Sequence, residues 1–121
     1  MTGKKEQISL EELVNLSFHD QCIEALKIDF SCNEVKMKIG MFNDLKNNYD
    51  FVEFIFKDVE QLSIENFNLE LFSLCEIYSH EVNIKIVDRP AIRIILLLGP
   101  NRPSASLDFS FSKCYAVPLE Y

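Results

Sequence analysis

The most distinctive polar pair in the sequence is His19 followed by Asp20. A histidine held by a carboxylate can act as a general base. Adjacent side chains of an extended segment point to opposite sides, so Asp20 is poorly placed to orient the His19 ring. The alternative is a histidine that hydrogen-bonds to backbone, with Asp20 fixing a turn. We prefer this structural interpretation and keep both residues as candidates for binding.

The four cysteines, Cys22, Cys32, Cys75 and Cys114, are the other candidates for chemistry. A thiol enzyme needs a cysteine beside a histidine, and zinc needs three or four ligands, usually supplied as close pairs. His19 and Cys22 form the only close pair, so we predict no catalytic residue, no metal site and no cofactor. Cys22 and Cys32 flank one expected strand, roughly 30 Å apart, which is too far for a disulfide. We expect four reduced thiols.

Acidic residues dominate the charge pattern, with a formal net charge of 12 − 19 = −7. This balance suits a basic protein partner. The alternative, which is the more common one for a mildly acidic surface, is that the charge serves only solubility. No basic stripe is available to neutralise phosphates, so we expect neither nucleic acid nor a membrane surface as partner. Glutamates of the middle of the chain form either a solvated face or an acidic docking surface, and they are Glu53, Glu60, Glu65, Glu70 and Glu76. The candidate binding residues are His19, Asp20, Glu53, Glu70 and Glu76.

The chain length of 121 residues and the hydrophobic content of 48% fit one globular domain, 1–121, in which 1–7 form a flexible tail. The longest apolar run, 94–98, is far shorter than the ~20 residues that a membrane-spanning helix needs. No apolar signal region follows the first residues. These features predict a cytoplasmic protein.

The elements that must position the candidate residues begin with a short helix. Ser9 and Glu12 form a capping box, in which Ser9 is the N-cap and Glu12 reaches back from the third helical position. Apolar residues at Leu10, Leu13 and Val14 recur at helical spacing, so we expect a helix that runs to about residue 16.

Beyond this helix, apolar and polar residues alternate with a period of two, which is typical of strands. The pattern covers 26–30, 35–39, 49–57, 69–78, 82–86, 92–98 and 107–112, with turns at 31–34, 43–48 and 99–103. The stretch 58–68 fits either helix or strand. Short connections favour an antiparallel meander. The predicted class is therefore α+β: six or seven mainly antiparallel strands, sandwich- or barrel-like, with one short N-terminal helix.

Two of these strands carry apolar side chains on both faces. Phe51 and Ile55 form the second face of strand 49–57, and Ile95 and Leu97 form that of strand 92–98. A half-exposed antiparallel sheet should alternate cleanly. One short helix cannot cover the second face of six strands, so either the sheet folds onto itself or another protein covers it.

The order of features resembles a group of small bacterial proteins that carry a Phe-His-Asp motif before a run of strands. Here the motif is Phe18, His19 and Asp20, and the matching strand segments are 23–30, 54–59 and 107–114. Some members of this group look like immunity proteins of polymorphic toxin systems, so the resemblance implies inhibition through binding. Where those proteins carry a glycine before the valine that follows the third strand, this chain has Asp58.

Three functional hypotheses follow. The first is a non-enzymatic cytoplasmic protein-binding module, of which an immunity-type inhibitor that occludes a toxin is one form. The second is a small enzyme or ligand-binding domain with a cleft near His19. The third is a structural subunit whose homodimer interface buries Ile95 and Leu97.

Overall fold

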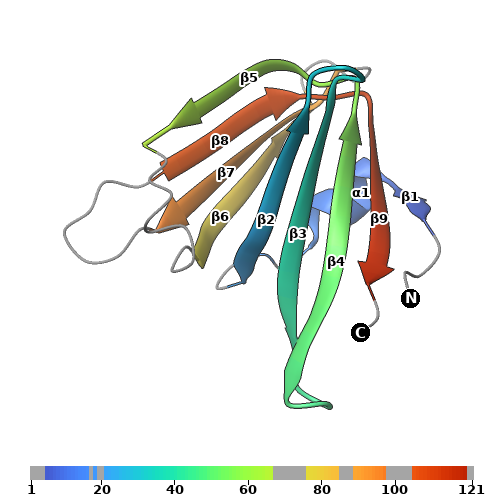
Figure 1. Cartoon of the computed structure of the whole chain (residues 1–121), viewed down its shortest axis with the longest axis vertical. Coiled ribbons are helices and arrows are strands. Elements are labelled where there is room, and N and C mark those ends of the chain that lie inside the picture. Colours follow the sequence, from blue (N-terminus) through green and yellow to red (C-terminus); the bar gives the residue numbers. More distant parts are fainter. Residues whose placement is uncertain are drawn as a thin grey trace.

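The computed structural model describes residues 5–16, 18, 21–66, 76–84, 89–97 and 105–119, which form nine strands and one helix (Figure 1). In chain order they are β1 (Glu6–Ile8), α1 (Leu10–Val14), β2 (Cys22–Asp29), β3 (Glu34–Asn43), β4 (Asn48–Lys57), β5 (Glu60–Glu65), β6 (Glu76–Asn83), β7 (Ala91–Leu97), β8 (Ala105–Ser110) and β9 (Lys113–Leu119). The prediction of a mainly antiparallel β-sheet with one short N-terminal helix is confirmed. The predicted number of six or seven strands is wrong.

The helix α1 begins with the predicted capping box. The Ser9 hydroxyl accepts a hydrogen bond from the Glu12 backbone N–H at 3.1 Å, and the Glu12 carboxylate accepts one from the Ser9 N–H at 3.2 Å. Leu13 is fully buried and attaches the helix to the core. The helix ends at the C-cap Asn15, one residue earlier than expected.

The strands form one continuous sheet in the order β1-β9-β4-β3-β2-β6-β7-β8-β5. It has two halves, since β2 and β6 pair at a single position, Cys22 with Glu76. We call β1, β9, β4, β3 and β2 the first half-sheet, and β6, β7, β8 and β5 the second. Each half contains a three-stranded meander, but β9 inserts between β1 and β4, so the predicted simple meander is wrong.

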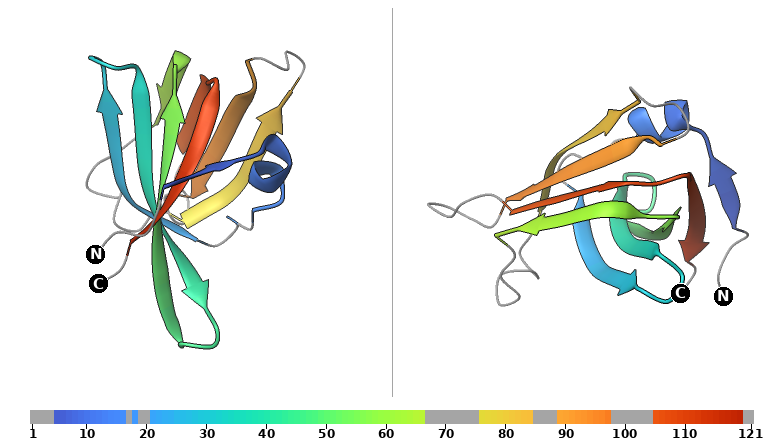
Figure 2. Two further views of the ribbon diagram at one scale, coloured as in Figure 1. Left: turned by 90° about the vertical axis from the view of Figure 1, so that its right-hand side faces the viewer. Right: turned by 90° about the horizontal axis from the view of Figure 1, so that it is seen from above.

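A bent two-stranded ribbon takes the chain from one half-sheet to the other. β4 pairs with β9 up to Lys57 and Lys113, and the continuing chain pairs β5 with β8 from Glu60 and Ser110 onward. A register shift follows Glu60 in β5. Bends of this kind let strands switch sheets, and the two halves fold over each other as two layers (Figure 2).

Asp58 lies at this bend with a φ of 54°, in the left-handed region that favours glycine. Its carboxylate accepts a hydrogen bond from the Ser112 hydroxyl at 2.5 Å. This bond joins the two sides of the ribbon. Asp58 also occupies the position where the resemblance implies a glycine. Aspartate tolerates this backbone conformation better than most other residues.

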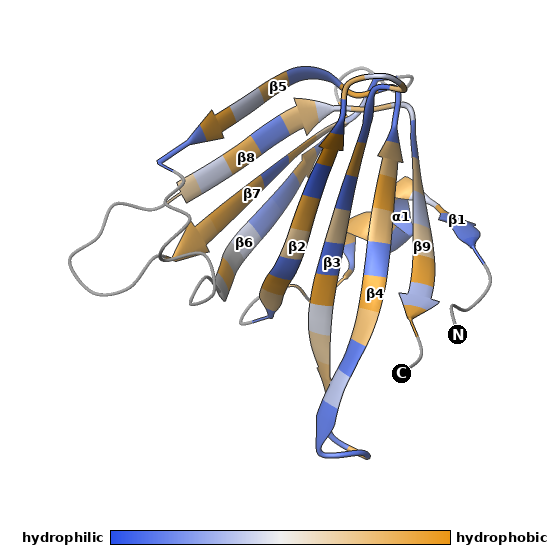
Figure 3. Ribbon diagram, viewed as in Figure 1, coloured by the Kyte–Doolittle hydropathy of each residue, from blue (hydrophilic) through white to orange (hydrophobic). Residues whose placement is uncertain are grey.

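The core lies between the two half-sheets. Phe56 of β4 contacts Phe109 and Phe111 of the other side of the bend, with ring centroids 4.9 and 5.0 Å apart in edge-to-face geometry. Apolar bands alternate with polar ones along β2, β3 and β4 (Figure 3). The sheet therefore buries one face of each strand against itself. The second apolar faces, with Phe51 and Ile55 on β4 and Ile95 and Leu97 on β7, lie on the outside.

Several local expectations need correction. Glu6 and Gln7, placed in the flexible tail 1–7, belong to β1, which pairs with β9. The ambiguous stretch 58–68 contains strand β5. One strand, β6, crosses the boundary expected between 69–78 and 82–86. The turn at 99–103 and most of the first of those two segments lie outside the described residues.

Candidate functional site

The predicted binding residues are only partly described. His19, Asp20 and Glu70 lie outside the described residues, as does the side chain of Glu76. Glu53 lies on β4, in register with Lys38 of β3 and Val117 of β9. It therefore projects from the outer face of the first half-sheet.

The other two described glutamates of the expected acidic surface, Glu60 and Glu65, do not join Glu53. Glu60 and Glu65 lie on β5, the edge strand of the second half-sheet. Glu60 is bonded to Arg89 at 2.9 Å, so its charge is compensated locally. The described residues therefore do not form the continuous acidic face that the sequence allowed.

The structure instead gathers exposed aromatic side chains on the hairpin formed by β3 and β4. Phe42 pairs with Tyr49, and Gly40 pairs with Phe51. All four belong to the outer face, because the alternate positions Ile39 and Val52 of the same strands pack toward the core. This hairpin extends beyond the neighbouring strands (Figure 1). We call Phe42, Leu45, Tyr49 and Phe51 the aromatic ledge.

The ledge is ordered yet open to solvent. Phe42 and Tyr49 form an edge-to-face pair with centroids 5.3 Å apart. They are 44% and 43% exposed, and Leu45, in the turn between the strands, is 98% exposed. A Cβ added at Gly40 would lie 3.0 Å from the Phe51 ring. The glycine therefore lets that ring lie close over the β3 backbone, a signal that our reading of the sequence missed.

Two hollows flank the ledge. One, of about 340 Å³, is lined by Cys22, Ile23 and Glu24 together with Gly40 of β3. The other, of about 800 Å³, extends toward Pro118 and Leu119 of β9. Tyr49 and Phe51 line both hollows. This arrangement of open hollows beside aromatic side chains can accept apolar side chains of another molecule.

Charged groups border the ledge at its base. The Lys38 ammonium lies 3.0 Å from the Glu24 carboxylate and 5.0 Å from the centroid of the Phe51 ring. The lysine therefore combines an ion pair with a cation–π contact. This contact places a polar rim beside the aromatic surface.

The turn of the hairpin is held by its own polar side chains. Asp50 accepts hydrogen bonds from the Asn43 amide at 2.8 Å and from Lys46 at 3.0 Å. These bonds hold the pKa of Asp50 below its usual value. Asn43 also accepts a hydrogen bond from the Leu45 N–H at 3.0 Å. Asn47 adopts a φ of 53°, which asparagine tolerates in turns.

Gln21 anchors the inner end of the hairpin. Its side-chain oxygen accepts a hydrogen bond from the Phe42 N–H at 2.9 Å, and its backbone oxygen accepts one from the Ile77 N–H at 2.7 Å. Gln21 thus links β3 to β6, and so the ledge to the second half-sheet. Nothing in the local sequence distinguishes this glutamine from an ordinary loop residue.

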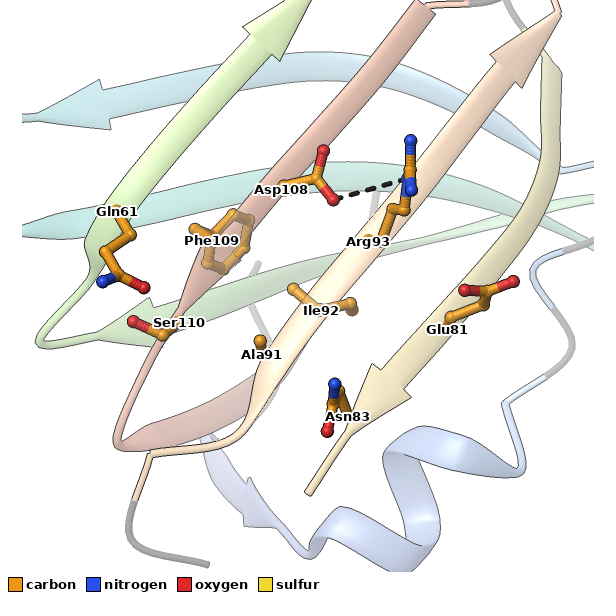
Figure 4. A pocket seen from close by; sticks show the side chains of 9 residues that line it. All are labelled: Gln61, Glu81, Asn83, Ala91, Ile92, Arg93, Asp108, Phe109 and Ser110. Atoms are coloured by element: carbon orange, nitrogen blue, oxygen red, sulfur yellow. Dashed lines mark ion pairs between the residues drawn. The ribbon is translucent and has the colours of Figure 1, made fainter. Parts of the chain in front are cut away.

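The outer face of the second half-sheet has a different character. A groove of about 320 Å³ lies over Ala91 and is bordered by Gln61, Glu81, Arg93 and Asp108 (Figure 4). Arg93 Nε lies 3.5 Å from Asp108 Oδ1, and Glu81 is its register partner on the other side. Polar and apolar side chains both line this groove, and its guanidinium is already paired with Asp108.

His80 is the histidine whose surroundings the structure describes. Its Nε2 lies 2.9 Å from the Leu13 carbonyl oxygen, and its ring centroid lies 4.6 Å from that of Phe18. The ring therefore connects α1 to β6. This geometry gives His80 a structural role at the junction of helix and sheet.

The surroundings of Cys32 and Cys114 make both thiols less acidic than usual. Neither forms a disulfide, and Cys75 lies outside the described residues. Burial raises the pKa of Cys114 to about 12. Desolvation and hydrogen bonds to Asp29 and Glu34 raise the pKa of the exposed Cys32. No group of three or more histidine, cysteine or acidic side chains that could hold a metal occurs within the described ranges.

Three kinds of known protein data were compared with the chain. Neither models of protein families, nor curated proteins, nor solved structures matched the chain. No helix in the described part of the chain is long and apolar enough to cross a membrane.

Proposed function

We propose that this chain is a non-enzymatic protein-binding module and that the aromatic ledge is its binding surface. One observation carries the proposal: Phe42, Leu45 and Tyr49 are strongly exposed on a hairpin that projects from the sheet. Aromatic residues are enriched in the centres of protein interfaces, where a few side chains supply most of the binding energy. A contiguous exposed apolar surface of this kind is typical of interaction sites.

The order within the hairpin supports the same function. The edge-to-face pair of Phe42 and Tyr49 and the Asn43–Leu45 and Asp50–Lys46 bonds fix the ledge before any partner arrives. A preorganised surface loses less conformational entropy on binding. Complete burial of one side chain such as Leu45 contributes roughly 1.5–3 kcal/mol.

Inhibition by occlusion is the form of this function that we propose to test first. A projecting, ordered hairpin can enter the cleft of a target and block it sterically. The resemblance of the sequence to immunity-type proteins points in the same direction. The binding surface proposed here is the ledge, with Glu53 at its base, in place of the scattered glutamates.

Site-specific photo-crosslinking in the native cell tests the proposal. A photoreactive phenylalanine analogue at position 45 should capture one protein reproducibly. The same analogue at Phe30 is the matched control, because Phe30 is 86% exposed in the turn between β2 and β3. Adding Tyr49→Ser to the position-45 variant should abolish the product. Equal products from positions 30 and 45, or none from 45, would refute the ledge as the binding surface.

A further inference from the structure

The charges around the ledge indicate which kind of protein it binds. Resting on the proposed function, we infer that the partner presents a basic surface, in which an aliphatic or aromatic side chain lies between lysine or arginine side chains. The acidic residues that surround the ledge are Glu24, Asp44, Asp50 and Glu53. The lysines beside them are Lys38 and Lys46.

Both lysines are already engaged. Lys38 is paired with Glu24, and Lys46 is paired with Asp50, each at 3.0 Å. These pairs remove two positive and two negative charges from the balance. They leave no unpaired lysine on the ledge, within the described residues, that could attract an acidic partner.

Of the four carboxylates around the ledge, those of Asp44 and Glu53 form no ion pair with another described residue. Asp44 lies in the turn at the tip of the hairpin, and Glu53 lies on β4 beyond Phe51. At ~3.3 Å per residue, the two ends of the ledge are roughly 15–20 Å apart. An acidic partner would desolvate both carboxylates without compensation, whereas a basic partner would neutralise them.

The aromatic side chains favour the same partner. The exposed rings of Phe42 and Tyr49 can stack with a guanidinium or ammonium group, as Lys38 already does with Phe51. The hollow of about 340 Å³ between Ile23 and Tyr49 can receive the apolar side chain. The ledge thus provides an apolar centre with acidic ends, and the complement of that pattern is an apolar side chain flanked by cations.

A random peptide library displayed on phage tests the inference without a known partner. It is selected in parallel against the wild-type chain, a ledge variant (Leu45→Ser, Tyr49→Ser), a charge variant (Asp44→Asn, Glu53→Gln) and the control Phe30→Ser. Circular dichroism and thermal midpoints establish that each variant is folded. Peptides enriched on the wild type and on Phe30→Ser should carry lysine or arginine on both sides of a leucine or an aromatic residue.

The variants test separately whether the ledge is the binding surface and whether its partner is basic. The ledge variant should lose the enriched peptides, and the charge variant should bind the best peptide about 3–10-fold more weakly at low salt. Enrichment of acidic or uncharged peptides, or equal affinity for the charge variant, would overturn the basic partner while leaving the ledge intact. Equal enrichment on the ledge variant, or no enrichment on the wild type, would overturn the ledge itself.

Discussion

The outer faces of the two half-sheets cover the same core but differ in chemistry. The first half-sheet exposes Phe42 and Tyr49, whereas the second carries Arg93 paired with Asp108. Folding requires only that an outer face be compatible with water, which the second face satisfies with its polar side chains. The exposed aromatic surface of the first face goes beyond this requirement, and it is the basis of our binding proposal.

The exposed aromatic surface is confined to one end of the outer face of the first half-sheet. In its middle, Ile55 and Val117 are only 7% and 9% exposed. At the end near the bend, Glu34 and Lys57 form an ion pair. The projecting hairpin, in contrast, leaves the apolar side chains of Phe42, Leu45 and Tyr49 open to solvent. The outer face of the first half-sheet is therefore closed in its middle and near the bend, and it continues into an open apolar surface on the hairpin.

The largest expected effect compares the two faces of one strand. Phe56→Ala removes a fully buried ring from the core and should destabilise the protein by about 3–5 kcal/mol. Phe51→Ala, on the outer face, should cost less than about 1.5 kcal/mol, because the ring is partly exposed. Urea unfolding of both variants measures the contrast. Equal losses of stability for the two variants would show that Phe51 has a structural role, and they would contradict the distinction between the core face and the outer face of β4.

The next effect concerns binding by the two outer faces. The double change Leu45→Ser and Tyr49→Ser should reduce affinity for the captured partner by about 30–100-fold, or roughly 2–3 kcal/mol. Leu97→Ser is the matched control, since Leu97 is 41% exposed on the second half-sheet. It should change affinity less than two-fold in calorimetric titration. A larger loss of affinity for Leu97→Ser would place the binding surface on the outer face of the second half-sheet. If the chain were also dimeric in solution, this result would favour the homodimer hypothesis.

A smaller effect is expected where Gln21 connects the ledge to the second half-sheet. Gln21→Ala removes the acceptor of the Phe42 N–H and should destabilise the chain by about 0.5–1.5 kcal/mol. Amide exchange of Phe42 should become faster, while that of residues in β7 should not change. Unchanged exchange at Phe42 would contradict a role for Gln21 in holding the hairpin.

The local features of the fold were the ones that the sequence could predict. Ser9 and Glu12 are three residues apart and bond to each other, so their capping box is visible without the fold. Alternation of apolar and polar residues is also a local pattern, and it identified the central strands. Strand β9 was not predicted, and it contains Pro118, a residue type that central strands normally exclude. Pro118 is tolerated since β1 pairs only with 114–116, leaving that edge of β9 without a β1 partner.

The site was less predictable than the fold. The sequence showed that strand 49–57 has a second apolar face that includes Phe51. It did not show at which residues that face becomes exposed to solvent. Exposure depends on how far the β3–β4 hairpin extends beyond its neighbours, and this follows from the lengths and order of strands that are distant in sequence. Glu53 was identified among the candidates, whereas Phe42, Leu45 and Tyr49 have no local signature that separates them from core or loop residues.

The smallest effect concerns the closed end of the first face and its dependence on pH. The hydrogen bond from Lys57 holds the pKa of Glu34 below its usual value of 4.5, and the same contact raises the pKa of Lys57 above 10.5. A lowered carboxyl pKa stabilises the folded state above pH 4.5, and this contribution is lost as the pH falls through the folded pKa. The raised lysine pKa stabilises below pH 10.5 and loses its effect at higher pH.

The pair should therefore stabilise the protein most between these two values. Glu34→Gln should lower the thermal midpoint by a few degrees at pH 7. The difference from the wild type should shrink as the pH falls below 4.5 and through the lowered pKa of Glu34, because protonation then removes the charge from the wild type as well. Glu65→Gln, at an exposed position of β5, is the control and should have little effect on the midpoint at pH 7. A difference for Glu34→Gln that stays constant with pH would show that the ion pair does not close this end of the face.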